Sequence, residues 1–491
     1  MKEIIAAIKS FFAGKSGKYL VLYVLSSIFI GFNCYLIYRD IYWLLLLPVF
    51  LVILYLYFYS LDKVLLLITM MTPIAINFRE FEFGFGISIP TEPLMAGVLV
   101  MFVLKLVFSN DYDTKIWKHP MTIIIVLQLL WMLITSFTSS LPLVSFKYLL
   151  ARLWFVIPFY IFGIHLFKKR VNIRLFIWFY AVPLVFVIFY TTYQHSLWGF
   201  EEKAGHWVME PFYNDHTAYG AVLALMIPLF YGFAFTRVYS RITRFFAFLV
   251  MLILFMALIL SYCRAAWISL AVALIVFLVI MFRIKLKWIA FITIIFGIVF
   301  YLFSFEILDR LEKNKQGSSA NFVEHIRSIS NISTDNSNLE RINRWQSALR
   351  MFEEKPVFGF GPGTYQFEYA PYQRSEEKTL ISTNAGDKGN AHSEYIGPLA
   401  EQGLPGMLLM VGVLVMMLIT AMRVYRKTND REVKMLSLST MLALITYFLH
   451  GTMNNFLDTD KASVPIWGLI AVLVSLDLYS NKQDAHDNEA I

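Results

Sequence analysis

The sequence has few charged residues for its length. Asp, Glu, Lys and Arg make up 15% of its 491 residues, whereas soluble domains carry about 25%. Hydrophobic residues make up 58%, and Phe, Tyr and Trp together 17%. The shortage of charge excludes an ordinary soluble domain and predicts an all-α, polytopic membrane protein.

Cysteine is also scarce. Cys34 and Cys263 both lie in apolar segments, so they provide neither a disulfide framework nor a metal-binding pair. The sequence has no HExxH motif and no acidic pair at ligand spacing, so we predict no metal site and no cofactor. The Gly359-x-Gly361-x-Gly363 segment has no Lys-Ser/Thr partner, and we interpret it as a tight turn rather than a nucleotide-binding loop.

Long apolar runs dominate the chain, and a spanning helix needs roughly 20 such residues. The runs lie at 19–38, 41–59, 61–78, 91–108, 120–138, 149–166, 173–192, 216–236, 244–262, 265–282, 287–304, 404–422, 434–450 and 463–479. We therefore expect about 12–14 transmembrane helices. The first run lacks a small-residue cleavage site and is predicted to be a span, not a signal peptide.

These runs predict three regions. Residues 1–304 hold about eleven N-terminal spans, residues 305–403 form one large extracytoplasmic loop, and residues 404–491 hold the C-terminal spans and a short cytoplasmic tail. A connection as long as 305–403 is usually functional. Within it, 339–353 has apolar residues at helical spacing, and 394–402 has the pattern of a short helix ended by Gly403.

The basic residues predict an orientation. With a cytoplasmic N-terminus and alternating spans, the clusters near 168–174, 237–244, 283–287 and 423–434 all fall in cytoplasmic connections. The opposite connections hold mostly single basic residues, as the positive-inside rule requires. We expect an even number of spans with both termini cytoplasmic. This distribution also explains the net charge of +8 without a nucleic-acid partner.

Three residues on the predicted outward side stand out. His392 lies where a polar loop meets a short helix, and a histidine can take a proton from an attacking hydroxyl; a surface histidine fits the same position. Arg264 lies between two apolar runs, where an arginine either serves a function or extends to the headgroups. Arg341 lies in a mixed-charge helical stretch, and by itself it fits a solvated face.

Other polar residues on the same side are possible supporting residues. They either line a cavity or cap helices. These candidates are His216, Tyr395, Glu401, Asn454 and Asp458.

Three segments in the C-terminal half together resemble the O-antigen ligase and polymerase superfamily of bacterial membrane glycosyltransferases. Residues 261–267, with Arg264-Ala265-Ala266, resemble its Ser-Arg-small-small segment. Residues 340–363 are similar to its arginine helix and Gly-x-Gly-Pro-Gly turn. Residues 392–406 resemble its His-Asn-x-x-Leu…Glu-x-Gly-x-x-Gly signature, with Ser393 where Asn is common. The resemblance extends roughly over residues 215–470.

The resemblance implies a GT-C-like fold and a metal-independent, inverting transfer of a glycan from undecaprenyl diphosphate. The site would face the periplasm of a bacterial inner membrane. Arg264 and Arg341 match the arginines that hold the diphosphate in the family, and His392 matches the loop histidine that activates or orients the acceptor hydroxyl.

The sequence is compatible with several activities. An O-antigen ligase with lipid A-core as acceptor is favoured slightly. An O-antigen or exopolysaccharide polymerase and a protein O-oligosaccharyltransferase share the same motifs. A flippase for lipid-linked glycans would share the many spans, but transporters often have internal repeats, and we find none.

Overall fold

The computed structural model describes residues 15–81, 85–108, 113–285, 336–379, 382 and 389–489. The predicted span 287–304 lies outside this part of the chain. The chain divides into two compact units, Met1–Val64 and Leu65–Ile491. We describe each unit by itself.

The described part of the first unit, from residue 15 on, consists mainly of two apolar helices. Helix α2 (Lys15–Tyr38) includes a segment long and apolar enough to span a membrane, Gly17–Tyr38. A 3-10 turn, η1 (Trp43–Leu46), leads into α3 (Leu47–Tyr59), and together they form a shorter apolar helix. Most of their large apolar side chains are exposed in this unit, as expected of surfaces that lie in lipid.

The region after Ser60 corrects one prediction. Residues 61–78 do not form a span: α4 (Leu61–Met71) has 11 residues, a length of about 16 Å. The 3-10 turn η2 (Thr72–Ile74) follows, with Pro73 inside it, where proline favours the end of a helix. The chain then forms an unpredicted antiparallel hairpin of β1 (Ile76–Phe81) and β2 (Phe85–Ile89).

The second unit is a bundle of long helices. Its helices that are long and apolar enough to span are α5 (Thr91–Phe108), α7 (Pro120–Phe137), the α8–α9 segment (Pro142–Leu166), α10 (Arg170–Leu197), α11 (His216–Phe235), α12 (Arg241–Leu260), α13 (Arg264–Met281), α18 (Ile396–Lys427), α19 (Arg431–His450) and the Asp460–Ser480 part of α20 (Asp460–Glu489). With α2 these are 11 candidate spans among the described residues. The prediction of an all-α polytopic membrane protein is confirmed.

Short elements connect these helices. The α8–α9 segment consists of α8 (Pro142–Val156), the π-helical η3 (Ile157–Phe162) and α9 (Gly163–Leu166). Helix α6 (Thr114–Trp117) precedes α7, and the 3-10 turn η4 (Ala204–His206) lies between α10 and α11.

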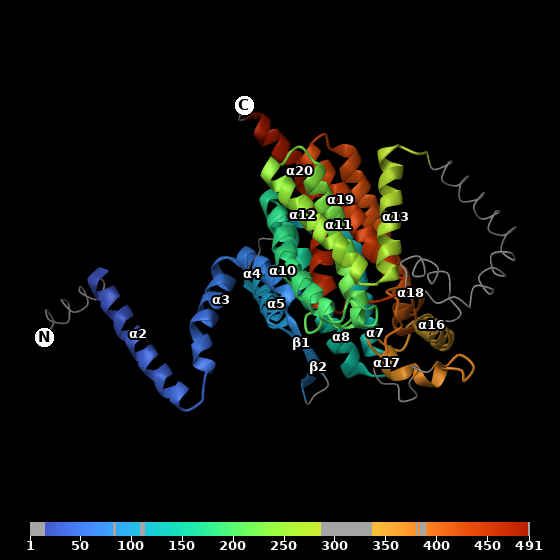
Figure 1. Cartoon of the computed structure of the whole chain (residues 1–491), viewed down its shortest axis with the longest axis horizontal. Coiled ribbons are helices and arrows are strands. Elements are labelled where there is room, and N and C mark those ends of the chain that lie inside the picture. Colours follow the sequence, from blue (N-terminus) through green and yellow to red (C-terminus); the bar gives the residue numbers. More distant parts are fainter. Residues whose placement is uncertain are drawn as a thin grey trace. The chain divides into compact units, whose positions relative to one another are not determined.

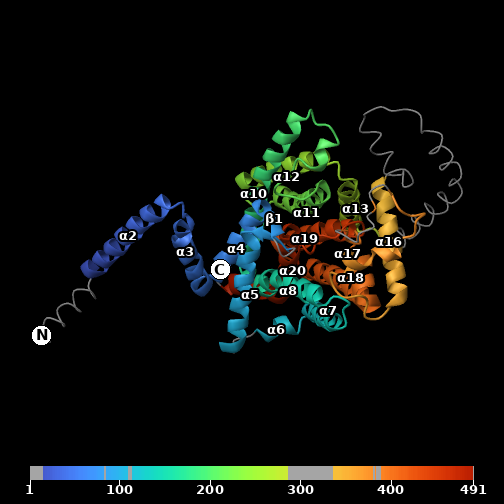
Figure 2. The same ribbon diagram turned by 90° about the horizontal axis from the view of Figure 1, so that it is seen from below.

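Helices α11, α19 and α20 and the α8–α9 segment form the most buried part of this unit. In their apolar spanning segments, 83% of the residues of α11 and of α20 are buried, and 72% of those of α19 and of α8–α9. Figure 2 shows α19 and α20 surrounded by α8, α11, α13 and α18. In the outer helices α5, α12 and α13, 17–22% of the residues of the apolar spanning segment are buried. Most of their surface is therefore available to lipid.

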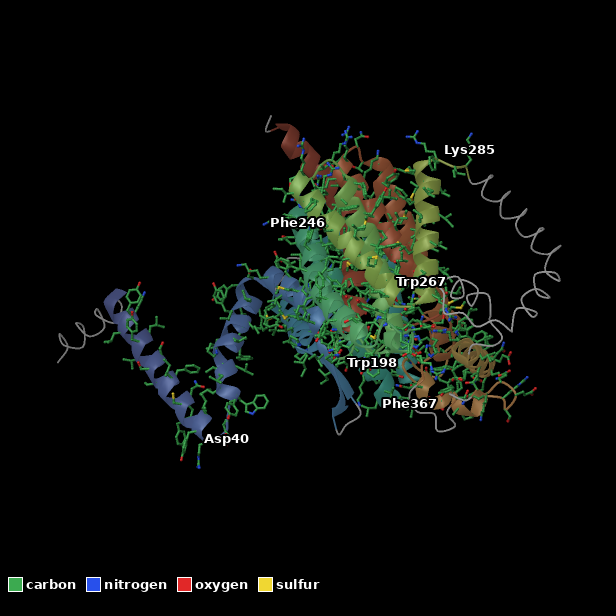
Figure 3. All side chains as sticks on the ribbon, viewed as in Figure 1. Asp40, Trp198, Phe246, Trp267, Lys285 and Phe367 are labelled. Carbon is green, nitrogen blue, oxygen red and sulfur yellow. The ribbon has the colours of Figure 1, made fainter. Side chains whose placement is uncertain are left out.

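The bundle has two chemically different ends. The loop end carries the connections 198–215, 261–263, 355–395 and 451–459, and the basic end carries 167–169, 236–240, 282–285 and 428–430. Trp198 and Phe367 lie at the loop end and Lys285 at the basic end (Figure 3). Along α5–α13 and along α18–α20, successive spans run in opposite directions between these two ends.

The long loop contains helical structure that packs on the loop end (Figure 1). Helix α16 (Asn336–Glu354) confirms the amphipathic helix predicted at 339–353. Helix α17 (Tyr365–Glu368) and the 3-10 turn η5 (Ala370–Tyr372) follow it. Their apolar core consists of Ala348, Met351, Phe360, Tyr365, Tyr369, Ala391 and Ala400.

Candidate functional site

A glycine-rich turn fixes α16 to the start of α18. The Phe360 amide donates to the Ala400 carbonyl (3.1 Å) and the Gly361 amide to the Glu401 carbonyl (2.7 Å). Gly359 has φ +65°, and a Cβ there would lie 2.3 Å from the Glu401 backbone. Only glycine permits both this conformation and this approach. The turn is therefore a packing device, in agreement with the sequence-based interpretation.

Gly403 allows the close approach of the start of α18 to the segment that follows α16. Its φ of +68° and ψ of −170° break α18, as predicted for a short helix ended at this residue. A Cβ on Gly403 would lie 2.1 Å from the Val357 carbonyl oxygen, and the next amide, that of Leu404, donates to Pro356 (2.9 Å). The two backbones hold the chain between α16 and α18 in one position.

Arg264 and His216 begin adjacent helices at the loop end. Arg264 is the first residue of α13, half-buried, with its guanidinium 3.9 Å from the Glu202 carboxylate. Asp215 caps α11 by accepting from the amides of Thr217 and Ala218 (2.8 Å each). His216, the first residue of α11, stacks on His206 with ring centroids 4.2 Å apart. Arg264, Arg341 and Asp215 are all electrostatic neighbours of His216.

Helix α16 supplies two arginines. Arg341 lies in its second turn and is half-buried. Arg344, one turn further on, donates from Nε to Glu340 (2.9 Å) and from Nη1 to the Asn390 carbonyl (3.1 Å). The latter bond joins α16 to the segment that carries His392. A planar guanidinium with several fixed donors suits this bridging role.

His392 has a constrained backbone. Its φ is +47°, a conformation that is uncommon for a residue with a side chain and that marks a constrained, often functional, position. Its amide donates to the Asn390 side chain (3.1 Å). The imidazole is only half-buried, so it remains within reach of a ligand.

The surroundings of His392 keep its ring neutral. Burial first, then the charges of Arg344 and Arg341, lower the pKa of His392 to about 3, against the smaller opposing effects of Asp215 and Glu340. A neutral imidazole has a free lone pair and can accept a proton. The same two arginines place positive charge beside the imidazole.

Glu394 holds the turn between α19 and α20 against the His392 segment. Its carboxylate is buried and accepts from the Tyr447 hydroxyl (2.6 Å) and from the amides of Phe456 (2.8 Å) and Leu457 (2.9 Å). Its own amide donates to the Gly451 carbonyl (2.7 Å). These bonds bring residues some sixty positions apart together, and they place the turn next to His392.

Tyr395 and Asn454 add to this junction. The Tyr395 hydroxyl donates to the Phe448 carbonyl (2.9 Å), and burial raises the pKa of Tyr395 well above its ordinary value. The Asn454 amide faces His450 Nε2 at 3.0 Å. His450 is 1% exposed, and Arg341, Asp215 and His216 are its electrostatic neighbours. Tyr395 and Asn454 thus support the walls of the site.

Glu401 and Asp458 have different environments. Glu401 is buried and accepts from the Tyr365 amide (3.0 Å), so it fixes the glycine-rich turn. The Asp458 side chain is accessible to solvent. Burial among protein atoms and then the charge of Glu394 nevertheless raise the pKa of Asp458 to about 6. Glu401 is therefore a structural contact, whereas the Asp458 carboxylate reaches solvent.

The structure brings the predicted residues to one end of the bundle. Arg264, Arg341, His216 and His392 come from four separate segments and share electrostatic neighbours. Sequence reasoning missed four residues of this region: Arg152, Arg344, Glu394 and His450. Only Arg152 had a usable signal, since an arginine inside an apolar run is a functional hypothesis. Nothing local in the sequence distinguished the other three.

The comparisons with known proteins agree with this location. A family model described as O-antigen ligase matches residues 249–411. The matched part contains Arg264, Arg341, His392 and the glycine-rich turn. No curated protein matches the chain. The family match confirms the resemblance to the O-antigen ligase superfamily and supports a ligase- or polymerase-type function.

Proposed function

From the O-antigen ligase domain in this chain, we propose that the protein transfers a glycan from a polyprenyl diphosphate, undecaprenyl diphosphate in a bacterium, to a hydroxyl of lipid A-core. The observation that carries the proposal is the convergence of Arg264, Arg341 and a neutral His392 at one end of a membrane bundle. In our proposal this end faces the periplasm, both termini are cytoplasmic, and the membrane is the bacterial inner membrane.

The two arginines serve the leaving group. In the transfer, the bond between the sugar C1 and the phosphate oxygen breaks, and the diphosphate leaves with additional negative charge. Arg264 and Arg341 are permanent cations with donors already oriented, so they stabilise the charge that develops in the transition state. Because the donor bond is already activated, the reaction needs no nucleotide.

His392 serves the acceptor. Its neutral ring accepts the proton of the acceptor hydroxyl while the hydroxyl oxygen forms the new bond to C1. Direct attack opposite the leaving diphosphate inverts the configuration at C1. The diphosphate also places negative charge near Arg341, which opposes the effect of this arginine on His392 and raises the basicity of the ring when the donor is bound.

The test uses the purified full-length protein in lipid nanodiscs. Wild type and His392→Ala are incubated with lipid-linked glycan and lipid A-core. Transfer to lipid A-core by wild type alone supports the proposal. Lengthening of the donor glycan instead would identify a polymerase, and transfer to protein Ser/Thr would identify a protein O-oligosaccharyltransferase. Donor binding without transfer to any acceptor would favour a lipid-glycan flippase and contradict the proposal.

A further inference from the structure

Arg152 is a buried cation whose hydrogen-bonding capacity is mostly unused. It lies about 15 Å along α8 from the start of this helix, and it is 9% exposed. Within the described part of the chain its guanidinium makes one hydrogen bond, to the Tyr148 hydroxyl (2.9 Å), and no ion pair. A guanidinium has five N–H donors, and burying a charge without partners is costly.

Carboxylates surround Arg152 without touching it. Glu394 and Asp458 are its electrostatic neighbours, and Glu401 joins them around Tyr148. Glu394 and Glu401 are already used in backbone contacts, as described above. Asp458 is accessible, and among the described residues its side chain makes one hydrogen bond, to its own backbone amide, and no ion pair. Unused donors on Arg152 and unused acceptors on Asp458 thus lie in one region of the loop end.

The charges in this region select the class of ligand. The carboxylates repel a phosphate group, and Arg152 repels a metal cation. A neutral molecule with many hydroxyls meets neither repulsion, since a hydroxyl can accept from a guanidinium and donate to a carboxylate. The Tyr148 ring adds an apolar face and a hydroxyl. This combination suits a carbohydrate.

The region also adjoins the proposed base. Glu394 follows His392 by two residues. The hydrogen bond from the Glu394 backbone amide to the Gly451 carbonyl holds the turn that carries Asp458. We propose that Asp458, Arg152 and Tyr148 form a carbohydrate subsite that positions the acceptor sugar so that one of its hydroxyls reaches His392. This inference rests on the proposed function, but it concerns the acceptor and not the diphosphate.

The experiment separates acceptor binding from donor binding. Full-length protein in nanodiscs is assayed for transfer at varied acceptor concentration, with lipid A-core and the free glycan repeat unit as acceptor probes. Binding of glycan-free undecaprenyl diphosphate is measured in parallel. The variants are Asp458→Asn, Asp458→Glu and, as a matched control, Glu353→Gln, which changes an exposed carboxylate on α16.

We expect Asp458→Asn to raise the acceptor KM by about tenfold, the effect of losing one charged hydrogen bond. Binding of undecaprenyl diphosphate should be unchanged. Asp458→Glu retains a carboxylate, so its acceptor KM should be closer to that of wild type. The acceptor KM of Glu353→Gln should equal that of wild type. Arg152→Lys retains the positive charge but loses the planar donors, and it should also raise the acceptor KM.

Three outcomes would overturn the inference. In the first, Asp458→Asn leaves the acceptor KM unchanged. In the second, Asp458→Asn weakens binding of undecaprenyl diphosphate as much as it weakens binding of the acceptor. That result would assign Asp458 to the donor site or to folding. In the third, Glu353→Gln has the same effect as Asp458→Asn. If wild type transfers to neither acceptor, the proposed function itself fails, and the inference fails with it.

Discussion

The two ends of the bundle use the same residue types in opposite ways. At the basic end, Arg423 and His119 both contact Asp477 (3.0 and 3.2 Å). Arg174 lies 3.6 Å from Glu432, and Arg170 bonds to Asp430. These pairs tie helices together.

At the loop end, two polar residues have fewer partners. Among the described residues, the Arg152 guanidinium makes one hydrogen bond, to the Tyr148 hydroxyl, and no ion pair. His392 has a positive φ and a half-exposed ring. The four basic residues named at the basic end contact carboxylates, whereas the Arg152 guanidinium and the His392 ring at the loop end retain capacity for a ligand. We therefore expect the pairing of a residue, and not its type, to separate structural from functional roles here.

The largest contrast between the two ends should come from their histidines. His392→Ala should lower the rate of glycan transfer by about 10³-fold, a typical contribution of a general base, with little change in thermal stability. The measurement is the initial transfer rate at saturating donor.

His119→Ala provides the control at the basic end. It removes a cap of α7 and a contact to Asp477, so it should cost about 1 kcal/mol of stability with the transfer rate retained. Equal losses of activity in the two variants would contradict the comparison.

The arginines should show a smaller contrast. Arg341→Gln should reduce kcat/KM for the donor by about 100-fold, the effect of losing one charged stabilising contact in the transition state. Arg170→Gln should lower Tm by several degrees through the loss of a charged hydrogen bond of about 1–3 kcal/mol, and it should retain donor binding. The idea fails if Arg170→Gln loses binding of undecaprenyl diphosphate and Arg341→Gln does not.

The glycines test whether the turn is a packing device. Gly403→Ala meets both an unfavourable φ and a carbonyl oxygen 2.1 Å away, so we expect a destabilisation of about 3 kcal/mol or more. Gly199→Ala has a similar φ, +61°, but no atom within 4 Å, and it should cost about 1 kcal/mol. Thermal unfolding of both variants measures the difference, and equal Tm values would show that the close approach is unimportant.

The smallest expected effect concerns pH. The free protein has a His392 pKa of about 3, and a general base works in its neutral form. Titration of His392 should therefore not reduce kcat/KM for the donor between about pH 5 and 8. The acidic limb of kcat should lie at a higher pH than that of kcat/KM, because the bound diphosphate raises the pKa of the ring. A limb near pH 6.5 in kcat/KM that is absent in His392→Asn would show that the ring titrates freely.

Much of the architecture follows from local patterns in the sequence. Long apolar runs have to form helices in lipid because each backbone group needs a partner within its own segment, and most of the predicted spans are helices in the structure. The break at Gly403 and the amphipathic α16 also follow from residue type and spacing. The hairpin after Pro73 did not, because the apolar run at 61–78 hides a short helix, a turn and a strand.

The sequence by itself determined which residues are costly in a membrane and which motif segments resemble a ligase. It did not determine which polar residues have partners for their charges and hydrogen-bonding groups. His119 and His392 are both single histidines beside apolar runs, and Arg170 and Arg152 are both arginines near helices. Only the tertiary structure decided that Asp477 contacts His119 and that Asp430 contacts Arg170. His392 and Arg152 keep unused hydrogen-bonding capacity. The reason is that hydrogen bonds and ion pairs form between side chains close in space, and here those partners lie up to several hundred residues apart.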